Sequence, residues 1–241
     1  MQLAPLDILQ ATFSLIFVVI SIIIGIKIST KYLTYKIQEL LLLGIFWIGI
    51  TSPWWPNVIT FLLILIFNAP ISIADFLIVG FAVLPITIII GLIAFTGIMK
   101  IEKWKRSLIV FIIAIPNLGF EILLFYFYFT DLSFIATITG TFTIEYSIFS
   151  QIYFIFGLIV FLITGISFSK QLLDAGDLKD NMRGKLLLVA FISFVIGTIL
   201  DFMFALTLIY VIARLILVSA SFEFYMGLIF PEWTRNIFLR E

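Results

Sequence analysis

Long apolar stretches alternate with short polar segments along this chain. A helix that crosses a bilayer needs about 20 mostly apolar residues. Six stretches meet that requirement without interruption, at residues 9–28, 76–99, 108–129, 148–169, 186–204 and 206–230. The pattern therefore predicts six membrane-spanning helices and leaves one more apolar region, residues 40–67, to be assigned.

The basic residues lie at the ends of these stretches, in four short clusters. Every Lys and Arg except Arg214 belongs to one of them: Lys27, Lys31 and Lys36; Lys100, Lys103, Lys105 and Arg106; Lys170, Lys179, Arg183 and Lys185; and Arg235 with Arg240. Short basic loops are retained on the cytoplasmic side of a membrane. We therefore expect all four clusters on one side, with the N-terminus outside and the C-terminus in the cytoplasm.

Residues 40–67 form an apolar region that the segment Ser52-Pro-Trp-Trp-Pro56 interrupts. Each half is too short to span a bilayer alone. If each half did cross, the later basic clusters would lie opposite the first one. A single span kinked at Pro53 and Pro56 keeps all clusters on one side, because proline removes a backbone hydrogen bond and bends a helix. The alternative is that residues 58–67 lie on the outer surface or re-enter the membrane. Both interpretations give seven spans.

The predicted fold class is all-α, a polytopic seven-helix transmembrane bundle that forms one domain over residues 1–241. Its outer segments would be residues 1–7, residues 68–75, the long loop 130–146 and a tight turn near Thr207, and none of them contains Lys or Arg. The N-terminal segment lacks the basic residues and the cleavage site of a signal peptide, so we expect the first stretch to remain as a span. The sequence thus predicts a multi-pass protein of the cell membrane.

The amino-acid composition excludes several kinds of catalytic and metal site. Hydrophobic residues make up 63% of the chain and charged residues 12%, about half the charge of a soluble domain, with no net charge. The chain has no Cys and no His, so we expect no thiolate nucleophile, no His-based proton relay, and no zinc or haem site. It also has no phosphate-binding loop and no Asp-rich metal motif. We expect no enzymatic activity, no cofactor or metal, and no binding to nucleic acid.

Arg214 lies about two turns inside the last span, where an arginine is costly unless it is paired or reaches water. Asp201, on the preceding antiparallel span, is the first candidate partner, and Glu121 is the second. Asn117 lies one turn before Glu121 on the same helix face, and Gln151 begins the fifth span. These five residues predict a polar cluster in the outer half of the bundle. It would be either a ligand or ion site, or an ion pair that only joins helices.

Trp54 and Trp55 lie between the two prolines of the second span. Two adjacent indoles inside a bundle are suited to line a pocket for an apolar or cationic ligand. Tryptophan is equally typical of membrane interfaces, where it anchors a helix, and this interpretation suits a re-entrant segment better.

The tail Phe222-Glu-Phe-Tyr-Met-Gly-Leu-Ile-Phe-Pro-Glu-Trp-Thr-Arg resembles the end of the seven-span modules that precede the cytoplasmic domains of bacterial and archaeal histidine kinases. The segments Ser52-Pro-Trp-Trp-Pro56, Gly184-Lys-Leu-Leu-Leu188 and Ala213-Arg-Leu-Ile-Leu217 are similar to those of uncharacterised archaeal seven-span proteins. The resemblance implies a sensor-like input module. No kinase, cyclase or similar region follows in this sequence, so we expect any output to need a partner.

These observations favour a stand-alone seven-span protein of sensor or receptor type, without its own catalytic domain. The alternative is a small multi-pass transporter or permease, with its substrate near Arg214, Glu121 and Asp201. The expected partners are the lipid bilayer and, at the inner face, a cytoplasmic signalling protein or anionic lipid. The lack of internal repeats and of matching broken helices in two halves disfavours the transporter.

Overall fold

The computed structural model describes residues 3–99, 101–203 and 209–239. In this part of the chain, seven helical segments are long and apolar enough to cross a membrane. They are α1 (Pro5–Tyr35), the interrupted segment of α2 (Gln38–Gly49), η1 (Ser52–Trp54) and α3 (Trp55–Phe67), the pair α4 (Ile73–Phe81) and α5 (Leu84–Ile98), α6 (Lys103–Thr130), α7 (Ile148–Leu173), α8 (Leu178–Met203) and α9 (Ile209–Ile229). The all-α bundle expected from the sequence is therefore present, and several helices extend beyond the predicted stretches.

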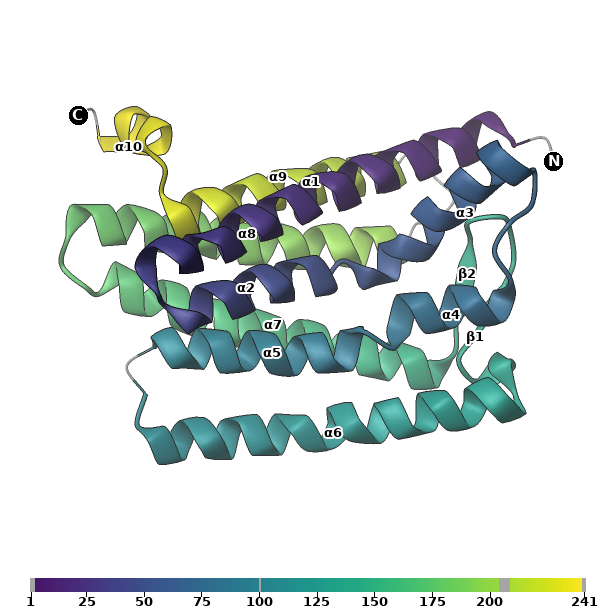
Figure 1. Cartoon of the computed structure of the whole chain (residues 1–241), viewed down its shortest axis with the longest axis horizontal. Coiled ribbons are helices and arrows are strands. Elements are labelled where there is room, and N and C mark those ends of the chain that lie inside the picture. The colour runs from purple at the N-terminus through teal and green to yellow at the C-terminus, as the bar shows by residue number, and fades with distance from the viewer. Residues whose placement is uncertain (1–2, 100, 204–208, 240–241) are drawn as a thin grey trace.

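The second apolar segment runs through the bundle once. Figure 1 shows α2 and α3 following one another in the same direction. The break between them falls at the two prolines, where η1 replaces regular helix. Proline cannot donate a backbone hydrogen bond, so the helix is interrupted there without reversing. This arrangement is the one expected for a single span bent at Pro53 and Pro56, and the crossing itself stays a prediction.

A second break divides the next segment into α4 and α5, just before Pro85. Ser72 begins α4 as an N-cap, because its hydroxyl oxygen accepts a hydrogen bond from the Asp75 backbone N–H at 3.1 Å. The chain reverses between α3 and α4 at Asn68, whose φ of 56° lies in the left-handed region that Asn tolerates.

The two ends of the bundle differ in composition. The connections between α1 and α2, α5 and α6, and α7 and α8 lie at one end with α10 (Glu232–Leu239), and we call this the basic end (Figure 1). These are the segments that hold the basic clusters of the sequence. The N-terminus, the α3–α4 connection and the segment between α6 and α7 lie at the opposite end. The predicted turn near Thr207, together with Lys100 and Arg240, lies outside the described residues.

The segment between α6 and α7 is more than the long loop that the sequence predicted. It contains η2 (Leu132–Phe134) and an antiparallel hairpin of β1 (Ala136–Ile138) and β2 (Ile144–Tyr146), with Thr137 opposite Glu145. We call the end of the bundle that it covers the hairpin end. Phe142, in the hairpin turn, is buried against α1 and α3, in a small cluster with Ala11, Phe61 and Ile64. The hairpin is therefore packed onto the bundle.

Toward the basic end the interior is filled by aromatic rings. Trp47 of α2 stacks on Phe224 of α9 with ring centroids 3.9 Å apart. Phe95 of α5 contacts Phe191 of α8 at 5.5 Å, and Phe191 contacts Phe224 at the same distance. We call these four residues the aromatic layer. Each is almost completely buried, so this half of the bundle is densely packed.

Candidate functional site

Arg214 is the most deeply buried charged side chain in the described residues, with a side-chain exposure of 1%. Its Nε lies 2.8 Å from Oδ1 of Asp201, whose side chain is 13% exposed. The partner that the sequence ranked first is therefore the one that the structure places beside Arg214. A guanidinium in such an environment needs a nearby anion, and the adjacent helices α8 and α9 supply it.

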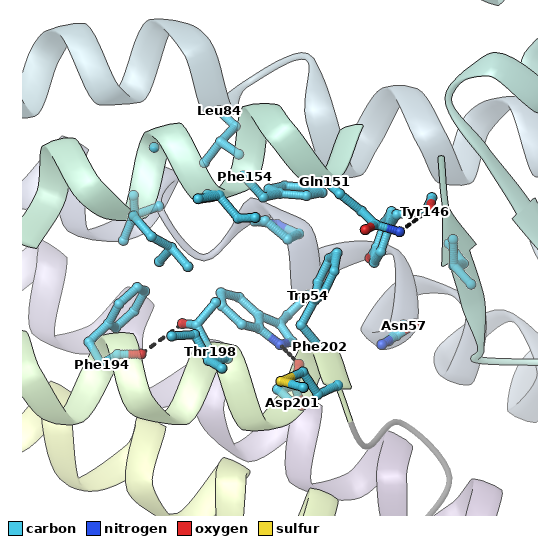
Figure 2. Close-up of a pocket in the computed structure, with 18 of the residues that line it drawn as sticks. Trp54, Asn57, Leu84, Tyr146, Gln151, Phe154, Phe194, Thr198, Asp201 and Phe202 are labelled. Atoms are coloured by element: carbon cyan, nitrogen blue, oxygen red, sulfur yellow. Dashed lines mark hydrogen bonds between the residues drawn. The ribbon is translucent and has the colours of Figure 1, made fainter. Parts of the chain in front are cut away.

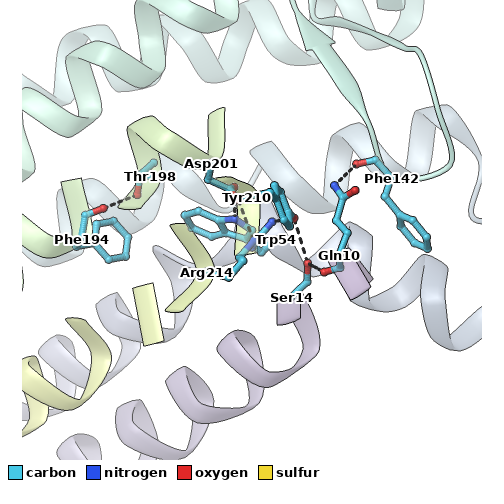
Figure 3. Close-up of polar contacts among 9 residues, drawn as sticks. All are labelled: Gln10, Ser14, Trp54, Phe142, Phe194, Thr198, Asp201, Tyr210 and Arg214. Carbon is cyan, nitrogen blue, oxygen red and sulfur yellow. Dashed lines mark hydrogen bonds and ion pairs between the residues drawn. The ribbon is translucent and has the colours of Figure 1, made fainter. Parts of the chain in front are cut away.

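The ion pair belongs to a network that joins four elements (Figure 3). Trp54 of η1 donates its indole N–H to Oδ2 of Asp201 at 2.8 Å. The Arg214 guanidinium carbon lies 5.5 Å from the centre of the Trp54 ring and 4.4 Å from that of Tyr210, and Nη2 donates to the Tyr210 hydroxyl. The hydroxyl of Ser14, on α1, lies 3.4 Å from that of Tyr210. The break at Pro53 and Pro56 is thus the place where the second segment meets the buried charges.

One nitrogen of the Arg214 guanidinium lacks a hydrogen-bond acceptor. Nη1 of Arg214 is buried and has no hydrogen-bond partner among the described residues. An unsatisfied buried donor on a charged group costs more than 1 kcal/mol, so native structures rarely leave one without an acceptor. Nη1 is therefore a donor whose hydrogen bond is unmade, while Nε has only its ion-pair contact with Asp201.

A cavity of about 410 Å³ lies beside this network, and Figure 2 shows Phe194 and Thr198 toward one end of it and Tyr146 and Asn57 toward the other. At the first end, Phe194 contacts Trp47 of the aromatic layer with ring centroids 5.7 Å apart. Its polar and charged lining residues include Asp201, Arg214, Gln10, Asn57, Gln151 and Thr198. Most of the remaining wall is aliphatic or aromatic, from Ile50, Leu84, Ile88, Phe154, Ile155, Leu158, Phe161, Phe194, Ile199 and Phe202. A mostly apolar cavity with a few converging polar groups is typical of a small-molecule site.

The hairpin covers this cavity at its end of the bundle. Tyr146 stacks on Phe202 of α8 with ring centroids 4.7 Å apart, and it contacts Phe154 of α7 at 5.2 Å. Gln10 of α1 donates its side-chain N–H to the Phe142 carbonyl at 3.3 Å. Burial raises the pKa of the Tyr146 phenol above its usual value, and the nearby Asp201 carboxylate raises it further. Tyr146 therefore stays neutral at physiological pH.

The structure divides the five predicted polar residues into two groups. Arg214, Asp201 and Gln151 line the cavity, where Gln151 donates to the Tyr146 carbonyl at 2.7 Å. Asn117 and Glu121 do not line it. They lie on α6, which packs mainly against α5 at the edge of the bundle, away from α8 and α9 (Figure 1). The expectation of one shared cluster needs this correction.

Asn117 and Glu121 lie instead beside Tyr153 of α7. The Tyr153 hydroxyl donates to Oδ1 of Asn117 at 2.7 Å, and its ring stacks on Phe120 with centroids 3.6 Å apart. This second group joins α6 to α7.

The two indoles also separate. Trp54 lines the cavity, whereas Trp55 does not, and its N–H donates to the Thr51 hydroxyl at 3.1 Å. The predicted pocket role is thus met in position by Trp54 alone.

The sequence did not point to Tyr210, Tyr146 or Gln10. Tyr210 precedes Arg214 by one helical turn, and this spacing was a usable signal. Tyr146 reaches the site only because the hairpin folds back over the bundle, and no local pattern in the sequence predicts that fold. Gln10 of α1 lines the cavity as well, and its side chain is held there by the Phe142 carbonyl. Among the described residues, no group of three His, Cys, Asp or Glu side chains is placed to hold a metal ion.

Comparison with known proteins adds no functional assignment. A scan against protein-family models and searches of curated proteins and of solved structures find no match for this chain.

Proposed function

We propose that this chain is a seven-span protein of the cell membrane, of sensor or receptor type, which binds a small molecule in the cavity and has no catalytic activity of its own. The seven long apolar helices support the membrane assignment. A soluble bundle would instead place charged residues on its outer faces. Here the exposed faces of the helices carry many large apolar side chains, such as Phe111 at 66% exposure and Ile122 at 69%.

The proposed orientation places the basic end in the cytoplasm and the hairpin end outside. The segments at the hairpin end contain Asp7, Asp75, Asp131 and Glu145 and no Lys or Arg. Basic residues in short loops are retained on the cytoplasmic side, whereas acidic residues have little influence. In this orientation the cavity lies in the outer half of the membrane.

The observation that carries the proposal is that the cavity occupies one half of the bundle and the aromatic layer fills the other. A sensor needs a site that a ligand reaches from one side. A transporter has to open the same site to both sides in turn, usually by moving two related halves against each other. The stacked Trp47 and Phe224 lie between the cavity and the basic end, so the geometry favours sensing.

The proposed output surface is the basic end, where α10 follows α9. Trp233, Ile237 and Phe238 of α10 are exposed at 47%, 63% and 40%. In the kinase modules that the tail resembles, the corresponding stretch leads from the last span into the cytoplasmic domain. We propose that α10 contacts a cytoplasmic signalling protein, with anionic lipid as the competing partner of the same basic surface.

Affinity capture in mild detergent tests this output. We expect one signalling protein to be recovered with the native chain, and its recovery to fall at least about tenfold with Trp233→Ala, as is typical for an aromatic hot spot. Trp104→Ala is the matched control, because Trp104 is an exposed tryptophan near the basic end on a different element. Equal recovery with both variants would contradict the assignment of α10. Saturable solute flux in proteoliposomes without a captured partner would instead establish the transporter alternative.

A further inference from the structure

The charges that face the cavity cancel. Among its lining residues the charged ones are Asp201 and Arg214, and they are paired at 2.8 Å. Tyr146 and Tyr210 also line the cavity, and a tyrosine phenol is neutral at physiological pH. The site therefore carries no net charge to offer a ligand.

This charge balance favours a neutral ligand over an anion or a cation. An ion moved from water into a low-dielectric interior costs several kcal/mol unless a partner of opposite charge is present. Asp201 and Arg214 already neutralise each other, so neither an anion nor a cation would find an uncompensated partner. A neutral molecule meets no such penalty.

The polar groups in the cavity wall indicate which polar group a ligand would carry. Nη1 of Arg214 is a donor without a partner, and Oδ1 of Asn57 is a buried acceptor without a partner among the described residues. Both residues line the cavity, as does Thr198. Both atoms are covered in the unliganded cavity, so a small shift of the side chains around them is needed before a hydroxyl or carbonyl head group can supply the acceptor that Nη1 lacks. The aliphatic and aromatic remainder of the wall would enclose an apolar body.

The rim of the cavity indicates where such a molecule comes from. Four apolar lining residues are also exposed: Ile155 of α7 at 57%, and Ile199, Phe202 and Met203 of α8 at 42%, 36% and 68%. Figure 1 shows α7 and α8 diverging from the loop that joins them toward the hairpin end. In a seven-span protein this apolar rim faces lipid, whereas the hairpin covers the end that faces water.

We infer that the cavity takes a neutral, lipid-dissolved molecule with an apolar body and one hydroxyl or carbonyl head, which enters from the bilayer between α7 and α8. The inference rests on the proposed function only in that the cavity binds a ligand in a membrane. It adds the chemical class of that ligand and its route.

Three probes that share one skeleton test the class: bromodecanol, bromodecylammonium and bromodecanoate, each with bromine at the chain end. The purified protein is placed in nanodiscs of uncharged lipid, and quenching of Trp54 fluorescence by bromine reports binding, with Trp54→Phe as the background. We expect bromodecanol to bind at least about tenfold more tightly than either charged probe, because each ten-fold step corresponds to about 1.4 kcal/mol and a buried charge costs more than that.

Changing the charge of the site should change the preference. Asp201→Asn leaves Arg214 uncompensated and should favour bromodecanoate, whereas Arg214→Gln leaves Asp201 uncompensated and should favour bromodecylammonium. For the route, Ile155→Trp should slow the binding of bromodecanol, measured as the Trp54 signal that remains after subtracting the same variant carrying Trp54→Phe. The matched control is Ile159→Trp, one turn along the same exposed face of α7 and not in the cavity wall, which should leave the rate unchanged.

The outcomes separate the two proposals. Tighter binding of a charged probe by the native chain would overturn the ligand class while leaving the cavity as a binding site. Equal rates for Ile155→Trp and Ile159→Trp would overturn the route. If none of the three probes quenches Trp54, the cavity is not a ligand site, and the proposed sensing function fails with it.

Discussion

Replacing Arg214 with leucine is expected to lower the free energy of unfolding by about 3–5 kcal/mol, because it leaves the Asp201 carboxylate buried without its partner. It also removes the donor to Tyr210 and the contact with the Trp54 ring. The double variant Arg214→Leu with Asp201→Asn should recover part of this loss, since the uncompensated charge is gone and the Asn oxygen still accepts from Trp54. Unfolding in a detergent of fixed composition measures both.

A surface ion pair provides the control. Lys105 and Glu102 are 3.0 Å apart, but their side chains are 50% and 61% exposed, so Lys105→Leu should change the unfolding free energy by about 1 kcal/mol or less. Equal losses in the single and double Arg214 variants would show that the buried charge is not what makes the pair important.

The second large effect is expected at the crossing of α1 and α2. A Cβ atom added to Gly25 would lie 2.8 Å from the Gly44 carbonyl oxygen, which is backbone and cannot move aside. Gly25→Val should therefore force the two helices apart and cost about 3 kcal/mol or more in stability. The fraction of protein that remains monodisperse after extraction, together with its unfolding temperature, measures the effect.

Gly119→Val is the matched control for this change. Gly119 also lies inside a long helix, α6, and a Cβ atom there would meet nothing within 4 Å. Both substitutions replace a helical glycine by the same β-branched residue, so only the contact across helices differs. A similar loss at both positions would mean that the α1–α2 contact is looser than described.

The apolar stretches were sufficient to predict the helices because each has to be long and apolar enough on its own. The break in the second segment could also be predicted from its two prolines, because proline acts locally on the hydrogen bonds of its own helix. The Arg214–Asp201 contact followed from depth and from the adjacency of two antiparallel helices.

The position of Glu121 and the hairpin could not be predicted, because both depend on how the helices pack and not on a local sequence pattern. Glu121 was placed near Arg214 because the two lie at similar depth, but depth says nothing about which helices are neighbours, and α6 lies at the edge of the bundle. The hairpin was missed because its strands are only three residues long and gain stability from the bundle beneath them. Without the hairpin, neither Tyr146 nor the covered cavity could be foreseen.

The proposed cavity belongs to the outer half of a membrane protein and does not open to the cytoplasm. The chain has no cysteine, so single cysteines can be labelled without background. Ser133→Cys and Asp177→Cys serve as references for the two sides, because Ser133 lies in η2 at the hairpin end and Asp177 in the α7–α8 connection at the basic end.

The decisive measurement is the labelling of Thr198→Cys, in the cavity wall, by a membrane-impermeant thiol reagent in sealed vesicles of each orientation. We expect that reagent on the side that labels Asp177→Cys does not modify Thr198→Cys, with or without bromodecanol. After denaturation the same cysteine should react fully. We also expect that Ser133→Cys is labelled only from the opposite side. Labelling of Thr198→Cys from the Asp177 side, or of both reference cysteines from one side, would contradict this placement of the cavity.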